Sequence, residues 1–440
     1  MAIVVMARQF PRALAAAKLD RDQGHLLLVQ HAAQASRKLE DLAAKESEAM
    51  RVAHLNYCFS RGQTPNDLVA QHWSLHRLAQ TQAAQPGFEV TILQRFHGDT
   101  EFEVDRVRYI ARRDNPREPM ASPWTLPWSL HREAQGLSPH VFHVHGLGFG
   151  VQVALLKKAT AGRVPIVVQH HGGLPPHGMR RWLQRITMRS VSGFLFNGAG
   201  NAEPWLQAGI VPSRGRLDEM LEASSDLRAI ERAVARRTLA LDDAPIVLWV
   251  ARLVPGKDPF TALGGFELAA QQRPTLRLHM IFRESNLLGD VDAWIAARPA
   301  LASRITRLGQ VPHAQLASWY SAADVFLTSS VREGSNYALI ESQACGVPAA
   351  CSDIPPHRYI AGGARTTHFF PCGDVHSCAS AIVGALRTER ANARAEVLRH
   401  FESRLTWVRV CERSFEIYRQ VAARHAGKAF GEVDQRNLRE

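Results

Sequence analysis

Residues 333–353 read EGSNYALIESQACGVPAACSD, and this stretch places one glutamate at position 333 and a second at position 341. The preceding DVFLTSS predicts a buried strand that ends near Ser330, whereas NYALIESQAC predicts a helix that Gly346 ends. Glu333 therefore falls in the connecting loop and Glu341 on the helix. A helix that begins directly after a strand offers free backbone N–H groups, which suit a phosphate group.

The start of this helix brings small and polar residues to the expected phosphate site. Ser335 or Asn336 is expected to cap the helix, and Gly334 allows a ligand to approach the backbone closely. Glu341 shares a helix face with Tyr337 and otherwise with small apolar residues, so its carboxylate needs donors, which sugar hydroxyls would supply. The alternative is that both glutamates are ordinary solvated acids.

Outward from this stretch, short β-rich runs alternate with helical segments along the chain after Met50. Such alternation predicts parallel sheets built from βα units, and a polar, charge-dense region at 231–245 separates two series of strands. We therefore expect an α/β protein with two Rossmann-like, doubly wound domains and ligand sites at the carboxyl ends of the strands. The expected divisions are an extension at 1–49, a first domain at 50–235, a second domain at 236–405, a helix at 406–425 and a tail at 426–440.

Composition and charge narrow the class of protein. The chain has 440 residues, enough for two domains, and no apolar run of about 20 residues that could span a bilayer. Lysine and arginine number 53 against 41 aspartates and glutamates, which favours anionic partners such as phosphates, nucleotides, nucleic acid or a lipid surface. The six cysteines contain no CxxC pair, so they indicate neither a zinc site nor a disulfide framework, and a reducing cytoplasm is expected.

The first 49 residues differ in character from the rest of the chain. MAIVVMA is too short for the apolar core of a signal peptide, and QASRKLEDLAAKESEA is a polar helical stretch. We expect a dispensable extension, or a start codon assigned too far upstream.

Four stretches together resemble the family 4 glycosyltransferases. EGSNYALIESQACGVPAACSD is similar to that family's region with two glutamates eight positions apart, and VLWVARLVPGKDP is similar to its arginine and lysine segment, although Ala251 stands where a glycine is usual. RLGQVPHAQLASWYSAADVFLTSSVREG and ESRLTWVRVCERSFEIY continue the match. The resemblance covers most of residues 50–425 and is stronger in the C-terminal half.

The resemblance implies the GT-B architecture, in which an acceptor-side domain and a nucleotide-sugar-binding domain, both Rossmann-like, face a central cleft. It implies a retaining, metal-independent hexosyl- or glycosyltransferase that needs no cofactor and uses a nucleoside diphosphate sugar as co-substrate. Arg252 and Lys257 would clamp the donor diphosphate, because fixed cations stabilise the charge that builds on a leaving phosphate. Glu333 would contact the donor sugar near the reacting carbon, while Glu341 would hold the ribose.

The resemblance also assigns roles to backbone groups and to the first domain. Amides near Gly334, Ser335, Asn336 and Tyr337 would cradle phosphate, but this loop departs from the commoner EGFGLPLLE form, which leaves the donor sugar open.

In the first domain, VPIVVQHHGGLP resembles the family strand that ends in HG, and His171 becomes the candidate for positioning sugar hydroxyls. A histidine at a strand end is otherwise more often structural. His145 in FHVHG is a weaker candidate for lining the cleft. Gly62 is also a weaker candidate. The loop after the first strand lacks the glycine pair that often stands there in the family, and Gly62 is the glycine that remains.

The acceptor is expected to be a glycan or a lipid-linked molecule in cell-surface or exopolysaccharide synthesis. MRRWLQRITMRS at 179–190 has an apolar stripe beside arginines, and it could dock on an anionic membrane or pack on its own sheet with a basic outer face. We therefore expect a cytoplasmic protein, with peripheral contact at the inner face of the membrane as an open alternative.

Several other functions are disfavoured. GLGFG at 146–150 imitates a dinucleotide fingerprint, but Val151 occupies the third glycine position. The DVD at 290–292 is expected in a helical connection and not at a metal. No interleaving of basic and aromatic residues supports nucleic-acid binding. A nucleotide-sugar epimerase on the same architecture is the rival function, and it would need no acceptor.

Overall fold

The computed structural model describes residues 49–60, 62, 64–113, 125–283 and 286–437. The described residues from Arg51 onward form one compact unit. The extension expected at 1–49 lies outside the described residues except for residue 49.

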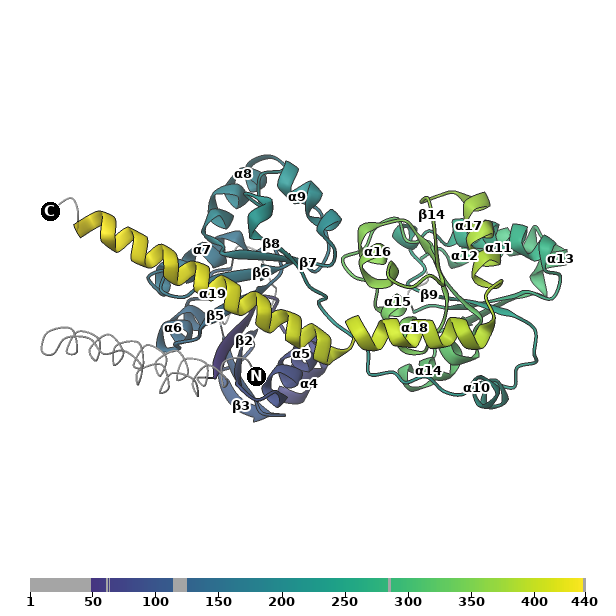
Figure 1. Ribbon diagram of the computed structural model, residues 1–440, viewed down its shortest axis with the longest axis horizontal. Helices are drawn as coiled ribbons and strands as arrows, with labels where there is room; N and C mark the ends of the chain where they lie inside the picture. Colours follow the sequence, from purple (N-terminus) through teal and green to yellow (C-terminus); the bar gives the residue numbers. More distant parts are fainter. Residues whose placement is uncertain (1–48, 61, 63, 114–124, 284–285, 438–440) are drawn as a thin grey trace, which may run out of the picture. The chain divides into compact units, whose positions relative to one another are not determined.

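The residues up to 219 form an eight-stranded sheet in the order β3-β4-β2-β1-β5-β6-β7-β8 (Figure 1). Strands β1, β5, β6, β7 and β8 pair in parallel, as do β2 and β4, while β3 and β4 are antiparallel. The strands are β1 (Met50–Asn56), β2 (Phe88–Phe96), β3 (Thr100–Val104), β4 (Val107–Arg113), β5 (Val141–His145), β6 (Ile166–Gln169), β7 (Gly193–Phe196) and β8 (Leu217–Glu219).

The helices of this first sheet occupy the connections between its strands. Thr64 caps the first of them with a capping box, because its hydroxyl accepts from the Asp67 amide while the Asp67 carboxylate accepts from the Thr64 amide. The helices are α4 (Pro65–Gln71), α5 (Trp73–Ala84), α6 (Trp128–Gly136), α7 (Gly150–Ala159), α8 (Gly178–Thr187), η1 (Met188–Ser190), η2 (Ala199–Ala202), α9 (Glu203–Gln207) and η3 (Arg214–Arg216).

The second sheet is parallel throughout and has the order β11-β10-β9-β12-β13-β14. Counted from β9, this is the doubly wound order 3-2-1-4-5-6, in which ligands bind where the strand order reverses, here beyond β9 and β12. The strands are β9 (Ile246–Val250), β10 (Arg277–Ile281), β11 (Ile305–Gly309), β12 (Val325–Thr328), β13 (Ala349–Ser352) and β14 (Thr367–Phe370).

Helices also connect the strands of the second sheet. Gly265 permits α11 to approach α17, because a Cβ at this position would lie 2.4 Å from Cys378 Sγ. The helices are α10 (Arg232–Thr238), η4 (Pro255–Lys257), α11 (Pro259–Gln272), α12 (Leu288–Ala296), α13 (Pro299–Ala302), α14 (His313–Ala322), α15 (Tyr337–Ala344), α16 (Pro355–Ala361), α17 (Val375–Ala385) and α18 (Arg390–Arg404). The DVD sequence falls in α12, as expected.

A buried carboxylate fastens the segment between the two sheets to the second sheet. Asp324, which directly precedes β12, is almost fully buried. One of its oxygens accepts from Arg236 of α10 and from the Ile246 amide, each at 2.8 Å. The other oxygen meets Arg390 of α18 at 2.6 Å. Since a buried carboxylate is stable only when it is paired, these contacts specify how α10 docks.

The last helix, α19 (Trp407–Asn437), returns to the first sheet (Figure 1). It packs on α5 and β5. The helix is longer than the expected 406–425, so residues 426–437, expected as a tail, are helical.

The alternation of strands and helices expected from the sequence is confirmed, but four strands were not foreseen. These are β3, β4, β8 and β14. The β3 sequence TEFEV alternates between half-buried and exposed positions, so it lacks the apolar run that marks a central strand. The other domain limits stay predictions.

Candidate functional site

Two predicted residues meet where the second sheet reverses its strand order. Lys257 ends η4 in the loop after β9, and Glu333 lies in the loop after β12. The Lys257 Nζ and a Glu333 carboxylate oxygen form an ion pair, with 16% and 9% of the two side chains exposed. Ser330 Oγ donates to the same Glu333 oxygen at 2.7 Å. Arg252 lies exposed on the loop after β9.

The start of α15 is shaped by Asn336, which confirms this residue and not Ser335 as the cap. Its Oδ1 accepts from the Leu339 amide at 3.1 Å. Its Nδ2 donates to Thr328 Oγ1 at 3.0 Å and lies 2.9 Å from His357 Nε2. Because its side chain is occupied on both sides, Asn336 can offer a ligand only its backbone. Burial lowers the pKa of His357 to about 4, so this imidazole is neutral and able to accept.

Glu341 is not in the apolar surroundings that its helix neighbours suggested. Its Oε2 accepts from the Tyr320 hydroxyl at 2.9 Å, and its Oε1 lies 3.0 Å from His313 Nε2. The hydrogen bond to Glu341 raises the pKa of His313, while burial first and the Glu341 charge second raise that of Tyr320. Both partners sit on α14 seven residues apart, a spacing that places them on one helix face and that sequence inspection overlooked.

Two predicted histidines meet at the carboxyl edge of the first sheet. His145 ends β5, and His171 comes two residues after β6. His145 Nδ1 lies 3.0 Å from His171 Nε2, and His171 Nδ1 is in contact with the Glu222 carboxylate. Glu222 was missed in the sequence, since it lies far along the chain in a segment without a recognisable motif.

The loops that carry His171 and Glu333 are in direct contact. A Cβ on Gly334 would lie 2.5 Å from the Gly172 nitrogen and 2.6 Å from its Cα, so only glycine fits at 334. Asn197 Nδ2 donates to the Gly334 carbonyl at 2.9 Å, and Asn201 Nδ2 to the Glu333 carbonyl at 3.2 Å. The two asparagines come after β7 and were not singled out from the sequence.

The remaining predicted residues take structural positions. A Cβ on Gly62 would lie 2.4 Å from Asp67 Cβ, so this glycine packs closely on the first turn of α4. Ser335 and the cap residue Asn336 are buried, while the first residues of α15 are half-buried. Burial, and secondly the charge of Glu222, raises the pKa of the Tyr337 hydroxyl.

A cluster of buried histidines lies behind His171. Ring nitrogens of His54, His143 and His145 lie within 4.8 Å of one another, a spacing at which imidazoles can hold a metal ion. His54 Nδ1 is already 3.0 Å from His145 Nε2, and His143 Nδ1 is 2.7 Å from the Tyr418 hydroxyl. We therefore interpret the cluster as a hydrogen-bond network.

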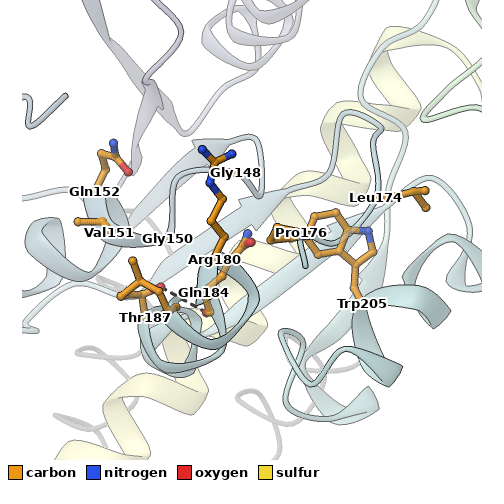
Figure 2. Close-up of a pocket in the computed structure, with 11 residues that line it drawn as sticks. Gly148, Gly150, Val151, Gln152, Leu174, Pro176, Arg180, Gln184, Thr187 and Trp205 are labelled. Atoms are coloured by element: carbon orange, nitrogen blue, oxygen red, sulfur yellow. Dashed lines mark hydrogen bonds between the residues drawn. The ribbon is translucent and has the colours of Figure 1, made fainter. Parts of the chain in front are cut away.

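Figure 2 shows a cavity at the carboxyl edge of the first sheet. It measures about 240 Å³ and is formed by the loops after β5 and β6 together with the start of α7, α8 and α9. Arg180 is its charged member. Its apolar lining residues are Val151, Leu174, Pro176, Leu183 and Trp205.

Helix α8 exposes the apolar stripe that could have packed on its own sheet. Met179 is 83% exposed, Trp182 61% and Ile186 45%. The interpretation of this stripe as a buried helix face is therefore wrong. In the described ranges, every helix is too short or too polar to cross a membrane.

Comparison with known proteins agrees with this fold. A family model described as "Glycosyl transferases group 1" matches residues 244–388, and one described as "Glycosyltransferase Family 4" matches residues 71–217. The chain belongs to this family of glycosyltransferases. Its architecture is GT-B, with two Rossmann-like domains, and it aligns along 85% of its length with sucrose-phosphate synthase from Thermosynechococcus elongatus (TM-score 0.62, 17% identity, 99% of that chain).

Two curated relatives and one further solved structure illustrate this similarity. A D-inositol 3-phosphate glycosyltransferase of Thermobispora bispora is 32% identical over 151 residues, which are 32% of this chain and 33% of that protein. A phosphatidyl-myo-inositol mannosyltransferase of Mycobacterium leprae is 29% identical over 140 residues, 30% of this chain and 36% of that protein. The chain thus matches about a third of the length of these curated relatives. HepE of Anabaena, solved with UDP and glucose, aligns with 83% of this chain and 98% of its own (TM-score 0.58, 16% identity).

Proposed function

We propose that this protein is a retaining glycosyltransferase that moves a sugar from a nucleoside diphosphate donor to a glycan or lipid-linked acceptor, in cell-surface or exopolysaccharide synthesis. One observation carries the proposal. The Lys257–Glu333 pair lies where the strand order of the second sheet reverses, and its loop contacts the loop of His171. Doubly wound domains bind nucleotides at this position.

The charges at this position suit transfer from a diphosphate. Lys257 is held by Glu333, which fixes its ammonium group before the donor arrives. Together with Arg252 it would stabilise the negative charge that builds on the leaving phosphate, without reorganisation during the reaction. Glu333, whose loop contacts the loop of His171, would contact the donor sugar.

The nucleoside would lie beside α15. Glu341 is oriented by Tyr320 and His313, and its carboxylate can accept hydrogen bonds from the two ribose hydroxyls. The backbone amides that begin α15 would hold phosphate, since the Asn336 side chain occupies only the Leu339 amide. No resident cofactor is part of this proposal.

The rival function, a nucleotide-sugar epimerase, would use the same donor site but needs no acceptor. The cavity of Figure 2 lies at the carboxyl edge of the first sheet, on the side from which loops would present an acceptor. This supports transfer, because an isomerase has no use for a second substrate site.

The surface of α8 favours a lipid-linked acceptor. Met179, Trp182 and Ile186 are exposed on a helix that also carries arginines, and such a helix binds the interface of an anionic membrane. The protein would then act at the cytoplasmic face of a membrane without crossing it. We expect vesicles with anionic lipid to retain the protein at low salt and Trp182→Ser to weaken retention. Trp128→Ser is the matched control, because Trp128 is also 61% exposed.

The donor site is tested by thermal shift with UDP, GDP, ADP and their sugars, without added metal. We expect one nucleotide to stabilise the protein and Glu341→Ala to abolish that stabilisation. Glu267→Ala is the control, because Glu267 lies on α11 outside the site and its carboxylate is also paired, with Arg298. If no nucleotide stabilises the wild type, the donor site is refuted. If a nucleotide-sugar is epimerised without an acceptor, the rival function is correct.

A further inference from the structure

A continuous chain of hydrogen bonds crosses the core of the first sheet and ends at His171. It joins residues from α19, α5, β1 and β5. The links on the side of α19 are Ser414 Oγ to the Cys411 carbonyl at 2.7 Å, Gln82 Nε2 to Ser414 Oγ at 2.8 Å and Gln82 Oε1 to His54 Nε2 at 2.8 Å. The links on the side of His171 are His54 Nδ1 to His145 Nε2 and His145 Nδ1 to His171 Nε2, each at 3.0 Å, and the contact of His171 Nδ1 with the Glu222 carboxylate.

The direction of this chain is set at its two ends. At one end is the backbone carbonyl of Cys411, which takes the Ser414 hydroxyl proton. Ser414 Oγ must then accept from the amide group of Gln82, which also donates to the Tyr418 hydroxyl at 3.3 Å. The Gln82 amide is thereby oriented with its carbonyl oxygen toward His54.

The orientation of the Gln82 amide decides which ring nitrogens of the histidines are protonated, because His54 and His145 each carry a single ring proton. Burial lowers the pKa of His54 to about 4 and that of His145 well below its ordinary value, so both are neutral near pH 7. His54 donates to Gln82 from Nε2 and therefore accepts at Nδ1. His145 must donate to it from Nε2, which leaves His145 Nδ1 bare. His171 must in turn donate from Nε2.

At the other end, His171 Nδ1 faces the Glu222 carboxylate, which is 5% exposed. Two lone pairs cannot face each other at this contact, so a proton lies between His171 Nδ1 and the carboxylate. We propose that Gln82, His54 and His145 are positioning residues that hold His171 as an imidazolium, with both ring N–H groups directed by the chain.

The consequence concerns the role of His171. A histidine that carries both protons cannot accept one, so His171 serves as a cation and donor, not as a base. Its side chain is 36% exposed and its loop touches Gly334, so the charge lies beside the proposed sugar site. That placement rests on the proposed function, whereas the proton count along the chain does not.

The protonation of His171 can be measured directly. Histidine-selective nitrogen-15 labelling with long-range proton–nitrogen correlation distinguishes protonated from bare ring nitrogens, and His171→Asn assigns the signals. At pH 7.5 we expect both His171 nitrogens to be protonated in the wild type. A bare His171 Nε2 would mean that the chain runs in the opposite direction, and a bare Nδ1 would mean that Glu222 holds the proton; either result would overturn the proposal.

A substitution at Gln82, which orients the chain, provides a second test. Gln82→Met removes the acceptor for His54, so the whole chain can reverse and His171 can become neutral with a bare Nε2. We expect the Nε2 signal to move from the protonated to the bare position. Gln94→Met is the matched control, since Gln94 is equally buried but bonds only to the Cys58 and Arg95 carbonyls, and it should keep the wild-type pattern. An unchanged pattern in a folded Gln82→Met protein would overturn the proposal.

The wild-type spectrum decides the question even if Gln82→Met does not fold. The two proposals also fail separately, because the nitrogen signals require no nucleotide and no acceptor. A wild-type protein with an imidazolium at His171 but no nucleotide binding would refute the donor site alone.

Discussion

Mild acidification should destabilise the first sheet before the second. The perturbation is a change from pH 7.5 to pH 5.5, at which ordinary carboxylates stay mostly ionised. Seven buried histidines have a pKa lowered by burial to about 4 or well below the ordinary value. Five belong to the first sheet and its helices, and two to the second; they are His54, His131, His143, His145 and His170, then His279 and His357.

The sign of the effect is set by proton uptake. In the unfolded chain each histidine binds a proton as the pH falls through about 6.5, whereas in the folded protein it stays neutral. Folding stability is therefore lost as the pH falls from the unfolded value toward the folded one. Between pH 7.5 and 5.5 the loss is roughly 1.3 kcal/mol per histidine. Summed over these histidines, this gives about 6.5 kcal/mol for the first sheet and about 2.6 kcal/mol for the second, against a typical domain stability of about 5–15 kcal/mol.

Hydrogen exchange read by mass spectrometry can monitor the two sheets separately. We expect peptides from residues 51–219 to lose protection at a higher pH than peptides from 246–370. His279→Met should remove about 1.3 kcal/mol of the acid sensitivity of the second sheet, with the exposed His177→Met as the control. If the second sheet opened first, or if neither sheet changed between pH 7.5 and 5.5, the assignment of buried neutral histidines would be refuted.

The remaining predictions concern single side chains. Gly334→Ala should lower turnover at least about tenfold, because the new Cβ meets the Gly172 backbone and one of the two loops must shift; unchanged turnover would show that this contact is dispensable. Asp324→Ala should cost about 3–5 kcal/mol in urea unfolding, because it leaves the buried Arg236 unpaired, and an unaltered midpoint would contradict this. Lys257→Ala should lower kcat by roughly 10- to 100-fold through loss of about 1.5–3 kcal/mol of charged hydrogen bonding, and wild-type kcat would remove Lys257 from the mechanism.

Local patterns in the sequence were enough to predict the parallel sheets and the neighbourhood of α15. Glu333 and Lys257 could be placed together because each comes after a strand, and adjacent parallel strands end at the same edge. Glu341 could be placed on its helix, but not between Tyr320 and His313. Those contacts depend on how α14 packs against α15, which the spacing of one helix does not specify.

Two features were out of reach for different reasons. The histidine chain joins Gln82 to Ser414, which are 332 residues apart, and no local pattern signals such a contact. The stripe of α8 was visible in the sequence, but periodicity shows only that one face is apolar. It does not show whether that face meets a sheet or is exposed, as Met179 and Trp182 are.

The return of α19 to the first sheet has a consequence for the order of folding during synthesis. The first sheet is complete in the nascent chain after residue 219, yet Ser414 and Tyr418, which close the hydrogen bonds of Gln82 and His143, are translated about 200 residues later. Synthesis at about 5–20 residues per second leaves these buried polar groups open for roughly 10–40 seconds. The first domain therefore emerges from the ribosome before α19 covers its core, and these hydrogen bonds form only when this last helix docks.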